Sequence, residues 1–486
     1  MELSSIHEYA VQALGSRSGC VRRGAAAGMA PSDHSCRPDR SRLRRTCPRP
    51  WVAGLVFILL LVLAAVASPA SPKDAELGGE RGEQLFARID EMLAEMSKMT
   101  GLEMKRPIQR SIITREQIRD LVESRLKEQT TPEEIRAEEL TLKMFGFVDE
   151  DFDLAKQYVD VLAEQATALY DYQAKQLYLA TWTPEDLQEV ALVHELAHAL
   201  ADQHFDLGKY LSKSRGADGD LARSAVIEGQ ASWIMVEYAM RQSGKSMVKS
   251  PLLAVTAASA SRFEAGQYPA YASAPLYIRE SLLFPYTAGL LFQQAVIEKH
   301  GAAGFTEVFR QPPVSSQQIL HPDAYFGQRL PTKPRIPKVR LGRGYKTISQ
   351  GQIGQWDHSI LLKQFIGEEE ARDLSPHWRG AYYKLRENKA SSQAVLAYAV
   401  DWSSPERARR YFELYRKICE KKWRPSKVEQ NPAGQVVGQS DKGNFVLTLN
   451  GRTVTSIEGL PNARLKTNAG GSKTSERQVA NERTTD

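Results

Sequence analysis

The segment from Pro184 to about Gln203 constrains the fold most, because it is an apolar helix that carries three polar side chains in its middle. It begins with a cap residue, a proline in the first turn and two acids near the positive end of the helix dipole. Alanine, leucine and valine fill most of the remaining positions, which predicts a buried central helix. His194, Glu195 and His198 lie within it. Buried polar groups without partners are costly, so these three side chains need a function.

The spacing of His194 and His198 predicts a metal site. Residues i and i+4 of a helix lie about one turn apart on the same face, so two imidazole nitrogens can reach one Zn²⁺ at about 2.0–2.1 Å. Glu195 is the next residue round the helix and lies beside the metal, where a general base must be to deprotonate water. Three protein ligands would leave a fourth position for that water. We therefore expect Zn²⁺ at this helix, with Glu195 as the catalytic base.

Two residues are candidates for the third protein ligand. His204 follows His198 at the spacing of the metzincins, but that family has glycine where this chain has Ala201, a helix former. Glu228 lies 30 residues beyond His198, among small and apolar residues of the next expected helix. The alternative for Glu228 is an exposed helical glutamate, and we expect Glu237 to be of that kind. We favour Glu228 as the ligand and a surface or capping role for His204.

A glutamate from a following helix that completes a His-Glu-x-x-His site resembles the gluzincins, the group of thermolysin and several aminopeptidases. Residues 284–289 (Phe-Pro-Tyr-Thr-Ala-Gly) look like the Pro-Tyr-x-x-Gly element of aminopeptidases related to aminopeptidase N. This resemblance implies that Tyr286 donates a hydrogen bond to the oxyanion; a packing tyrosine at a helix start is the alternative. His321 is a second candidate donor, or a loop histidine held by Pro322. The resemblance implies a zincin-like fold, Zn²⁺ as cofactor and a peptide or protein substrate.

The resemblance covers about residues 165–345 and is partial. Residues 312–322 look like a segment of poorly characterised bacterial proteins that carry a His-Glu-x-x-His helix and a Glu-Gly motif. The exopeptidase segment Gly-Ala-Met-Glu-Asn and the third-ligand motif of thermolysin are missing, so we expect an endopeptidase. Asp202 lies four residues after the second histidine, as an aspartate does in thermolysin. It either orients the site or satisfies nearby backbone groups.

These residues predict a metallopeptidase mechanism. Glu195 takes a proton from water as the water attacks a peptide carbonyl, and passes it to the leaving amine. In zincins the strand before the metal helix lies along the cleft, so we expect residues 177–181 to pair with an extended substrate. The competing hypothesis is a non-catalytic extracytoplasmic protein that retains the fold and binds a peptide or a surface.

An export signal precedes the folded part. Four arginines within residues 42–49 come before an apolar run, 51–67, that ends in Ala-Val-Ala, which is typical of a secretory signal peptide. A run of 17 residues is also at the short edge of a membrane span, so an uncleaved membrane anchor is the alternative. Residues 1–50 form a basic leader, in which Met29 is an alternative start. We expect a secreted or periplasmic protein, or one anchored to the membrane.

The net charge is concentrated in this leader. Residues 1–50 contribute +5 of the net charge of +6, so the remaining 436 residues carry about +1. We therefore expect no basic surface for phosphate groups and no nucleic-acid partner. Three of the four cysteines also precede residue 51, which leaves Cys419 as an expected small core residue.

The rest of the chain predicts an α+β fold in two units. We expect a linker over 68–80, a zincin-like domain over 81–330, an extended linker over 331–346, a smaller C-terminal α+β domain over 347–462 and a disordered tail over 463–486. The first domain should contain a strand near 111–113, helices from 115 and over 132–144, a hairpin over 168–181, a helix over about 220–240 and another from about 286 to 301. The second should contain strands over 381–385 and 394–402, a helix from Pro405 and a hairpin turn at Asn450–Gly451.

Overall fold

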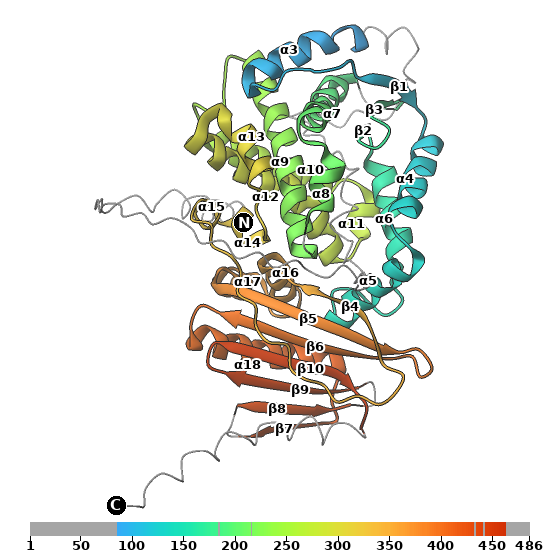
Figure 1. Cartoon of the computed structure of the whole chain (residues 1–486), viewed down its shortest axis with the longest axis vertical. Coiled ribbons are helices and arrows are strands. Elements are labelled where there is room, and N and C mark those ends of the chain that lie inside the picture. Colours follow the sequence, from blue (N-terminus) through green and yellow to red (C-terminus); the bar gives the residue numbers. More distant parts are fainter. Residues whose placement is uncertain (1–84, 183–184, 215, 432–433, 441–442, 463–486) are drawn as a thin grey trace, which may run out of the picture.

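The computed structural model describes residues 85–182, 185–214, 216–431, 434–440 and 443–462. The predicted leader, the apolar run 51–67, the linker 68–80, the tail 463–486 and the helix-start residues 183–184 lie outside the described residues. Within the described part, no helix combines the length and the apolar character needed to cross a membrane. The protein is α+β, with a mainly helical portion stacked on a portion built around a long antiparallel sheet (Figure 1).

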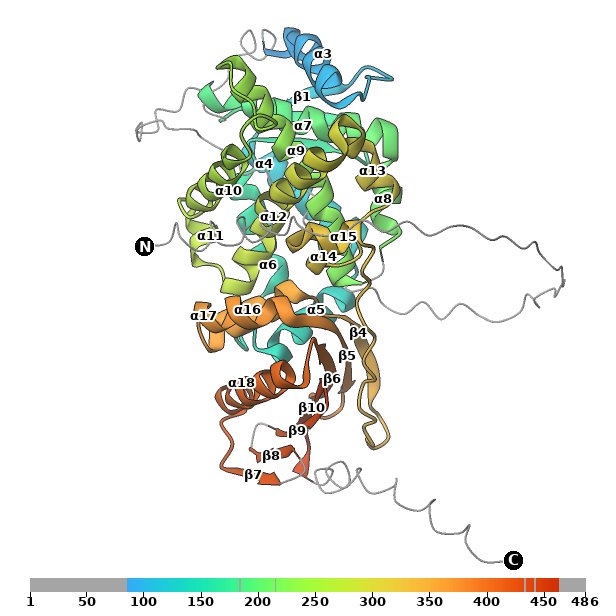
Figure 2. The same ribbon diagram turned by 90° about the vertical axis from the view of Figure 1, so that its left-hand side faces the viewer.

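The helical portion comes first in the chain. Its longest helices, α7, α9 and α12, run through the middle, and shorter helices surround them (Figures 1 and 2). Its elements are α3 (Ile89–Thr100), β1 (Gln109–Ile113), α4 (Arg115–Gln129), α5 (Pro132–Phe145), α6 (Leu154–Gln165), β2 (Ala168–Asp171), β3 (Gln176–Ala180), α7 (Glu185–Phe205), α8 (Leu207–Ser212), α9 (Ala217–Gln242), α10 (Leu252–Ala265), α11 (Pro269–Ser273), α12 (Leu276–His300), α13 (Gly304–Arg310), α14 (Ser316–Leu320) and α15 (Pro322–Phe326).

Local signals account for several of these boundaries. Thr114 caps α4 and Thr131 caps α5, each within a complete capping box. The predicted hairpin over 168–181 is confirmed as the antiparallel pair β2 and β3. One prediction is wrong: the helix expected from about residue 286 begins at Leu276, and Pro285 lies inside it. A proline after apolar residues predicts a helix start, but tertiary packing supports this helix despite the backbone hydrogen bond that Pro285 cannot donate.

The small sheet of the helical portion has the strand order β1-β3-β2. β3 is parallel to β1 and antiparallel to β2, so both of its edges are paired. The expectation that residues 177–181 receive an extended substrate is therefore wrong, because the central strand has no free edge. β2 is the edge strand that lies beside the metal helix.

The second portion is built on a seven-stranded antiparallel sheet with the order β4-β5-β6-β10-β9-β8-β7. Ser404 caps α18. The hairpin predicted around Asn450–Gly451 is confirmed as β9 and β10, but the turn is shifted by one residue: Asn450 pairs with Thr453, and Gly451 and Arg452 form the turn. Its elements are β4 (Lys346–Gln352), α16 (Gln355–Phe365), α17 (Glu368–Leu374), β5 (Trp378–Asn388), β6 (Gln393–Trp402), α18 (Pro405–Trp423), β7 (Lys427–Asn431), β8 (Gln435–Gln439), β9 (Asn444–Asn450) and β10 (Thr453–Leu460).

The largest hydrophobic core is shared by the two portions. It joins residues of α4, α5 and α6 to the inner face of the long sheet and to α18, with Val122, Leu142, Tyr398 and Tyr415 all buried. The separation into domains 81–330 and 347–462 therefore stays a prediction. Cys419 is fully buried in this core, as expected, and burial raises the pKa of its thiol well above the usual value.

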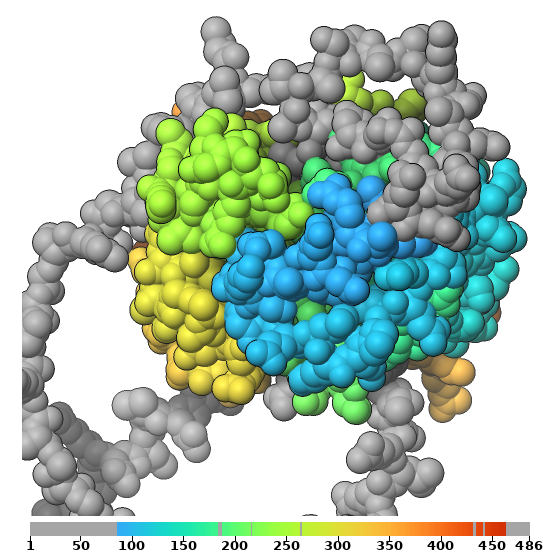
Figure 3. Space-filling model, turned by 90° about the horizontal axis from the view of Figure 1, so that it is seen from above, coloured from blue at the N-terminus to red at the C-terminus, as the bar shows by residue number. Residues whose placement is uncertain are grey.

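A second core holds α7 in place. α3, α7 and α9 pack together through apolar residues such as Met92, Leu192 and Trp233. Seen from above, α3 lies across this end of the molecule, beside α13 (Figure 3). The central helices are thus enclosed on the side of α3 as well as on the side of the long sheet.

Candidate metal centre

The helix predicted to carry the metal ligands is confirmed as α7, and its polar residues His194, Glu195 and His198 are buried in the helical portion. The exposed fraction is 0% for His194, 4% for Glu195 and 9% for His198. Their ligand atoms lie within 4.8 Å of one another. The apolar residues around them on α7 pack in the second core. The three polar side chains therefore lie inside the protein.

Glu228 lies between the two imidazoles. Its Oε2 atom is 3.2 Å from Nε2 of His194 and 3.3 Å from Nε2 of His198. Ligand atoms that each lie about 2.0–2.1 Å from a tetrahedral ion are separated by roughly 3.3–3.4 Å. Both distances from Oε2 of Glu228 therefore match the separation of two ligands to one ion, and two imidazoles with a carboxylate are a donor set that suits Zn²⁺.

A close crossing of two helices brings Glu228 to this point. α9 and α12 meet at Gly229 and Gly289, where a Cβ atom on Gly229 would lie 2.1 Å from the backbone carbon of Gly289. Only glycine permits so close an approach of two backbones. Gly229 follows Glu228, and Gly289 lies one turn after Tyr286, so the same crossing places both side chains beside α7.

The electrostatics of the cluster keep the carboxylate of Glu228 ionised. Burial would raise the pKa of Glu228, but the adjacent imidazoles outweigh it and lower this pKa to about 2. Burial lowers the pKa of His194, which favours the neutral imidazole that metals bind. Burial also opposes the charged form of His198, but the Glu228 carboxylate outweighs it and raises the pKa of His198.

Glu195 lies beside this cluster and is held by the edge strand β2. Its carboxylate accepts a hydrogen bond from the backbone N–H of Tyr170, and no hydrogen bond joins it to either imidazole within the described part of the chain. Burial raises the pKa of Glu195 to about 7, against the opposing effect of His198. A carboxylate with a pKa near neutrality is suited to general-base catalysis.

Two buried tyrosines complete the surroundings. The ring of Tyr286 stacks on that of His194 with centroids 6.0 Å apart, and its hydroxyl lacks a hydrogen-bond partner among the described residues. Burial raises the pKa of Tyr286 well above the usual value, and the charges of Glu228 and Glu195 add to this shift. Tyr158 of α6 has a similar unpartnered hydroxyl, and burial and the charges of Tyr172 and Glu228 raise its pKa. Sequence reasoning missed Tyr158, because a tyrosine on an amphipathic helix resembles any core residue.

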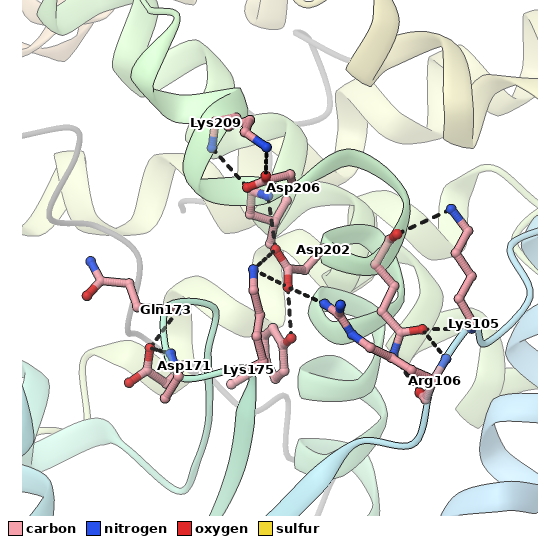
Figure 4. A network of polar contacts seen from close by, with 12 residues as sticks. Lys105, Arg106, Asp171, Gln173, Lys175, Asp202, Asp206 and Lys209 are labelled. Carbon is pink, nitrogen blue, oxygen red and sulfur yellow. Dashed lines mark hydrogen bonds and ion pairs between the residues drawn. The ribbon is translucent and has the colours of Figure 1, made fainter.

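Asp202 belongs to a polar network at the end of α7 rather than to the metal cluster (Figure 4). It accepts hydrogen bonds from the Tyr170 hydroxyl at 2.9 Å, the Lys175 ammonium at 2.8 Å and the Leu207 backbone N–H at 3.1 Å. The network ties α7 to the β2–β3 hairpin. Asp202 thus satisfies backbone and side-chain donors, and it reaches the site only through Tyr170, whose N–H contacts Glu195.

The remaining candidates lie elsewhere. His204, near the end of α7, donates a hydrogen bond to the carbonyl of Glu103, as the surface role predicts. His321 forms a hydrogen bond with Gln355 of the second portion. The expectation for Glu237 is wrong: it is fully buried and accepts hydrogen bonds from Ser246, the Met247 backbone and Arg241, which the spacing of residues on α9 could not reveal.

Comparisons with known proteins bear on the second portion. Residues 341–468 match the model of a domain family of unknown function (DUF8575). The search of curated proteins and the search of solved structures found no match to the chain. His194, Glu195, His198 and Glu228 lie outside the matched residues, and their function is inferred from their own chemistry.

Proposed function

We propose that the protein is a zinc-dependent peptidase with a zincin-like fold, in which His194, His198 and Glu228 hold the ion. The observation that carries this proposal is the convergence of three ligand atoms, with Oε2 of Glu228 3.2 Å and 3.3 Å from the two Nε2 atoms. Zn²⁺, when bound there, would supply Lewis-acid activation of water. The leader expected from the sequence would export this peptidase.

Two side chains beside the ligands would supply the proton transfer and the stabilisation of the oxyanion. Glu195 is the general base: it accepts a proton from water and later delivers it to the leaving amine. Tyr286 donates a hydrogen bond to the developing oxyanion, because its hydroxyl is free and its ring lies against His194. The edge strand β2, and not β3, is the strand that an extended substrate would meet, because both edges of β3 are paired. The Tyr170 N–H is already donated to Glu195, so the substrate would have to pair with other backbone groups of β2.

A second function is favoured by the burial of the site. Catalytic zinc sites keep an open position, whereas structural sites are closed, and here Glu228 and Tyr286 are only 1% and 2% exposed. A non-catalytic protein that retains the metal and binds a peptide or a surface would have such a closed site. In a peptidase, the helices over the cluster must separate to admit the substrate.

Metal content and hydrolysis of an unstructured protein, measured on three purified full-length proteins, distinguish these functions. The unaltered chain should contain stoichiometric zinc and hydrolyse the substrate. Glu195→Gln should retain zinc and lose at least about 100-fold in rate, and His204→Ala should retain both properties. Zinc in all three proteins without hydrolysis in any would establish the non-catalytic function. Full activity in Glu195→Gln would refute the assignment of the base.

A further inference from the structure

The segment that joins the two portions carries an unbalanced charge. Residues 329–346, here called the basic strap, contain seven lysines and arginines and no acidic residue. Residues 51–486 together carry about +1, and the basic strap alone contributes +7, so the rest of that range carries about −6. No basic surface was expected from the sequence, because only the total charge of residues 51–486 was considered. A near-zero total does not show that the positive charges are concentrated in one segment.

The basic strap crosses the outer face of the long sheet. It leaves α15, passes over β5 and β6 and returns to β4, on the side of the sheet opposite α18 (Figures 1 and 2). Val339, Leu341 and Tyr345 pack against Val395 and Ile457 of the sheet, and Arg386 donates a hydrogen bond to the Val339 carbonyl at 3.3 Å. The strap is therefore attached to a flat face by its apolar side chains, which leaves its cations exposed.

Most of these cations lack acidic partners. Among the described residues, six of the seven have no carboxylate within 4 Å; they are Arg329, Lys333, Arg335, Lys338, Arg343 and Lys346. All six are exposed. Asp401 of β6 accepts hydrogen bonds from Thr332 of the strap and from Thr453. The positive charge is thus not neutralised within this face.

A hollow of about 150 Å³ lies between the strap and the sheet. Lys338 of the strap meets Lys384 and Arg386 of β5 at its wall, and the floor is aliphatic, with Ile336, Leu341 and Val395. Three cations around an aliphatic floor suit a phosphate group that is attached to a hydrocarbon. No aromatic side chain lines the hollow, so it offers no surface on which nucleobases could stack.

We propose that the basic strap docks this face onto an anionic phospholipid surface and that the hollow receives a headgroup phosphate. Clusters of lysines and arginines bind anionic membranes electrostatically, and Leu330, 69% exposed beside Arg329, adds an apolar side chain that can enter the interface. The phosphates of a duplex nucleic acid would satisfy the cations but not the aliphatic floor. This proposal is independent of the peptidase function.

Co-sedimentation of the full-length protein with vesicles tests the docking. Two vesicle types are compared, phosphatidylcholine alone and phosphatidylcholine with about one third phosphatidylglycerol. The measured quantity is the partition coefficient for the anionic vesicles divided by that for the neutral vesicles. Any insertion of residues 51–67 raises both coefficients and therefore cancels in the ratio. We expect a ratio far above one that falls with added salt. The triple variant Lys333→Gln/Arg335→Gln/Lys338→Gln should lower it roughly 100-fold, and Lys384→Gln about fivefold.

The matched control removes the same charge elsewhere. Lys213→Gln/Lys245→Gln/Lys249→Gln replaces three exposed lysines of the helical portion and should leave the ratio within about twofold of the unaltered protein. A ratio near one for the unaltered protein would overturn the proposal, as would an equal loss in the control variant. Tighter, strap-dependent binding of duplex DNA than of anionic vesicles would overturn the choice of lipid and make this a nucleic-acid surface.

Discussion

The candidate metal centre depends on Glu228, whose carboxylate would be the third ligand. It is 1% exposed and faces two imidazoles, of which His194 favours its neutral form. A buried carboxylate needs a positive charge beside it. In the absence of an ion, protonated His198, whose pKa the Glu228 carboxylate raises, provides that charge. A divalent cation bound by neutral imidazoles would take its place. The sequence could place both histidines and Glu195 from their spacing, but it could only choose Glu228 over His204, because the choice depends on how two helices cross.

Glu228→Ala should lower zinc affinity by at least about 100-fold, since it removes a directly bound ligand. Competition against a chromogenic chelator measures this affinity. His204→Ala is the matched control and should bind zinc as the unaltered protein does, because His204 bonds to Glu103 at the far end of α7. The opposite pattern, with zinc lost in His204→Ala alone, would move the third ligand to His204.

Tyr286→Phe should lower kcat about 100-fold while zinc content stays unchanged. The ring that stacks on His194 is retained, and only the hydroxyl that would bond to the oxyanion is lost. Steady-state hydrolysis of a fluorogenic peptide measures the effect. Tyr158→Phe removes the other unpartnered hydroxyl near Glu228 and should have a smaller effect. If Tyr158→Phe alone abolishes turnover, Tyr158 is the oxyanion donor.

At the scale of elements, the helices and hairpins were predictable and their crossings were not. The Pro405 start and the hairpin around Asn450–Gly451 were predicted from local signals, and the structure confirms both, with the turn one residue later. The capping boxes at Thr114 and Thr131 are local signals of the same kind. The start of α12 was misplaced because a local signal, Pro285, is overridden by packing. The pairing of β3 with β1 joins residues far apart in the sequence, so the true edge strand could not be identified from the hairpin alone.

The crossing of α9 and α12 gives a prediction of its own. Gly289→Ala would place a Cβ atom 2.2 Å from the Ala225 carbonyl oxygen, so the helices must separate. We expect a loss of about 3 kcal/mol in the free energy of unfolding, measured in urea, and weaker zinc binding. Gly219→Ala in α9 would place its Cβ atom 3.0 Å from the hydroxyl oxygen of the flexible Ser214 side chain and at an ordinary contact distance of 3.6 Å from the Val314 carbonyl oxygen, so it should change stability by less than about 1 kcal/mol. Equal stability of the two variants would show that the crossing is not tight.

At the scale of the whole molecule, the shared core and a group of buried carboxyls connect the two portions. Burial raises the pKa of Glu138 of α5 and of Asp218 of α9, and the charge of Asp357 of α16 adds to both shifts. Asp218 accepts hydrogen bonds from the Ser316 backbone and Gln352, and Asp357 accepts them from the Gly354 backbone and Tyr277. The sequence could not predict this group, because its members come from three distant segments.

These buried carboxyls, at the junction of the two portions, should make the free energy of unfolding depend on pH. Burial raises the pKa of Glu138 to about 7, and the charges of Asp357 and Asp220 add to the shift. Between the usual carboxyl pKa and about 7, the folded state holds a proton that the unfolded chain has lost, so stability falls as pH rises through this window. Glu138→Gln removes the ionisation. At about pH 8 this variant should be more stable than the unaltered protein by roughly 2 kcal/mol, and at about pH 5 the two should be equal.

Urea unfolding at the two pH values measures the difference, with Glu133→Gln as the control. Glu133 is exposed on the same helix, so its replacement should shift stability equally little at both pH values. A difference between Glu138→Gln and the unaltered protein that is the same at both pH values would mean that Glu138 is ionised throughout. The junction would then have to hold its negative charges by hydrogen bonds or bound cations, and the two portions would be joined by the hydrophobic core without help from protonation.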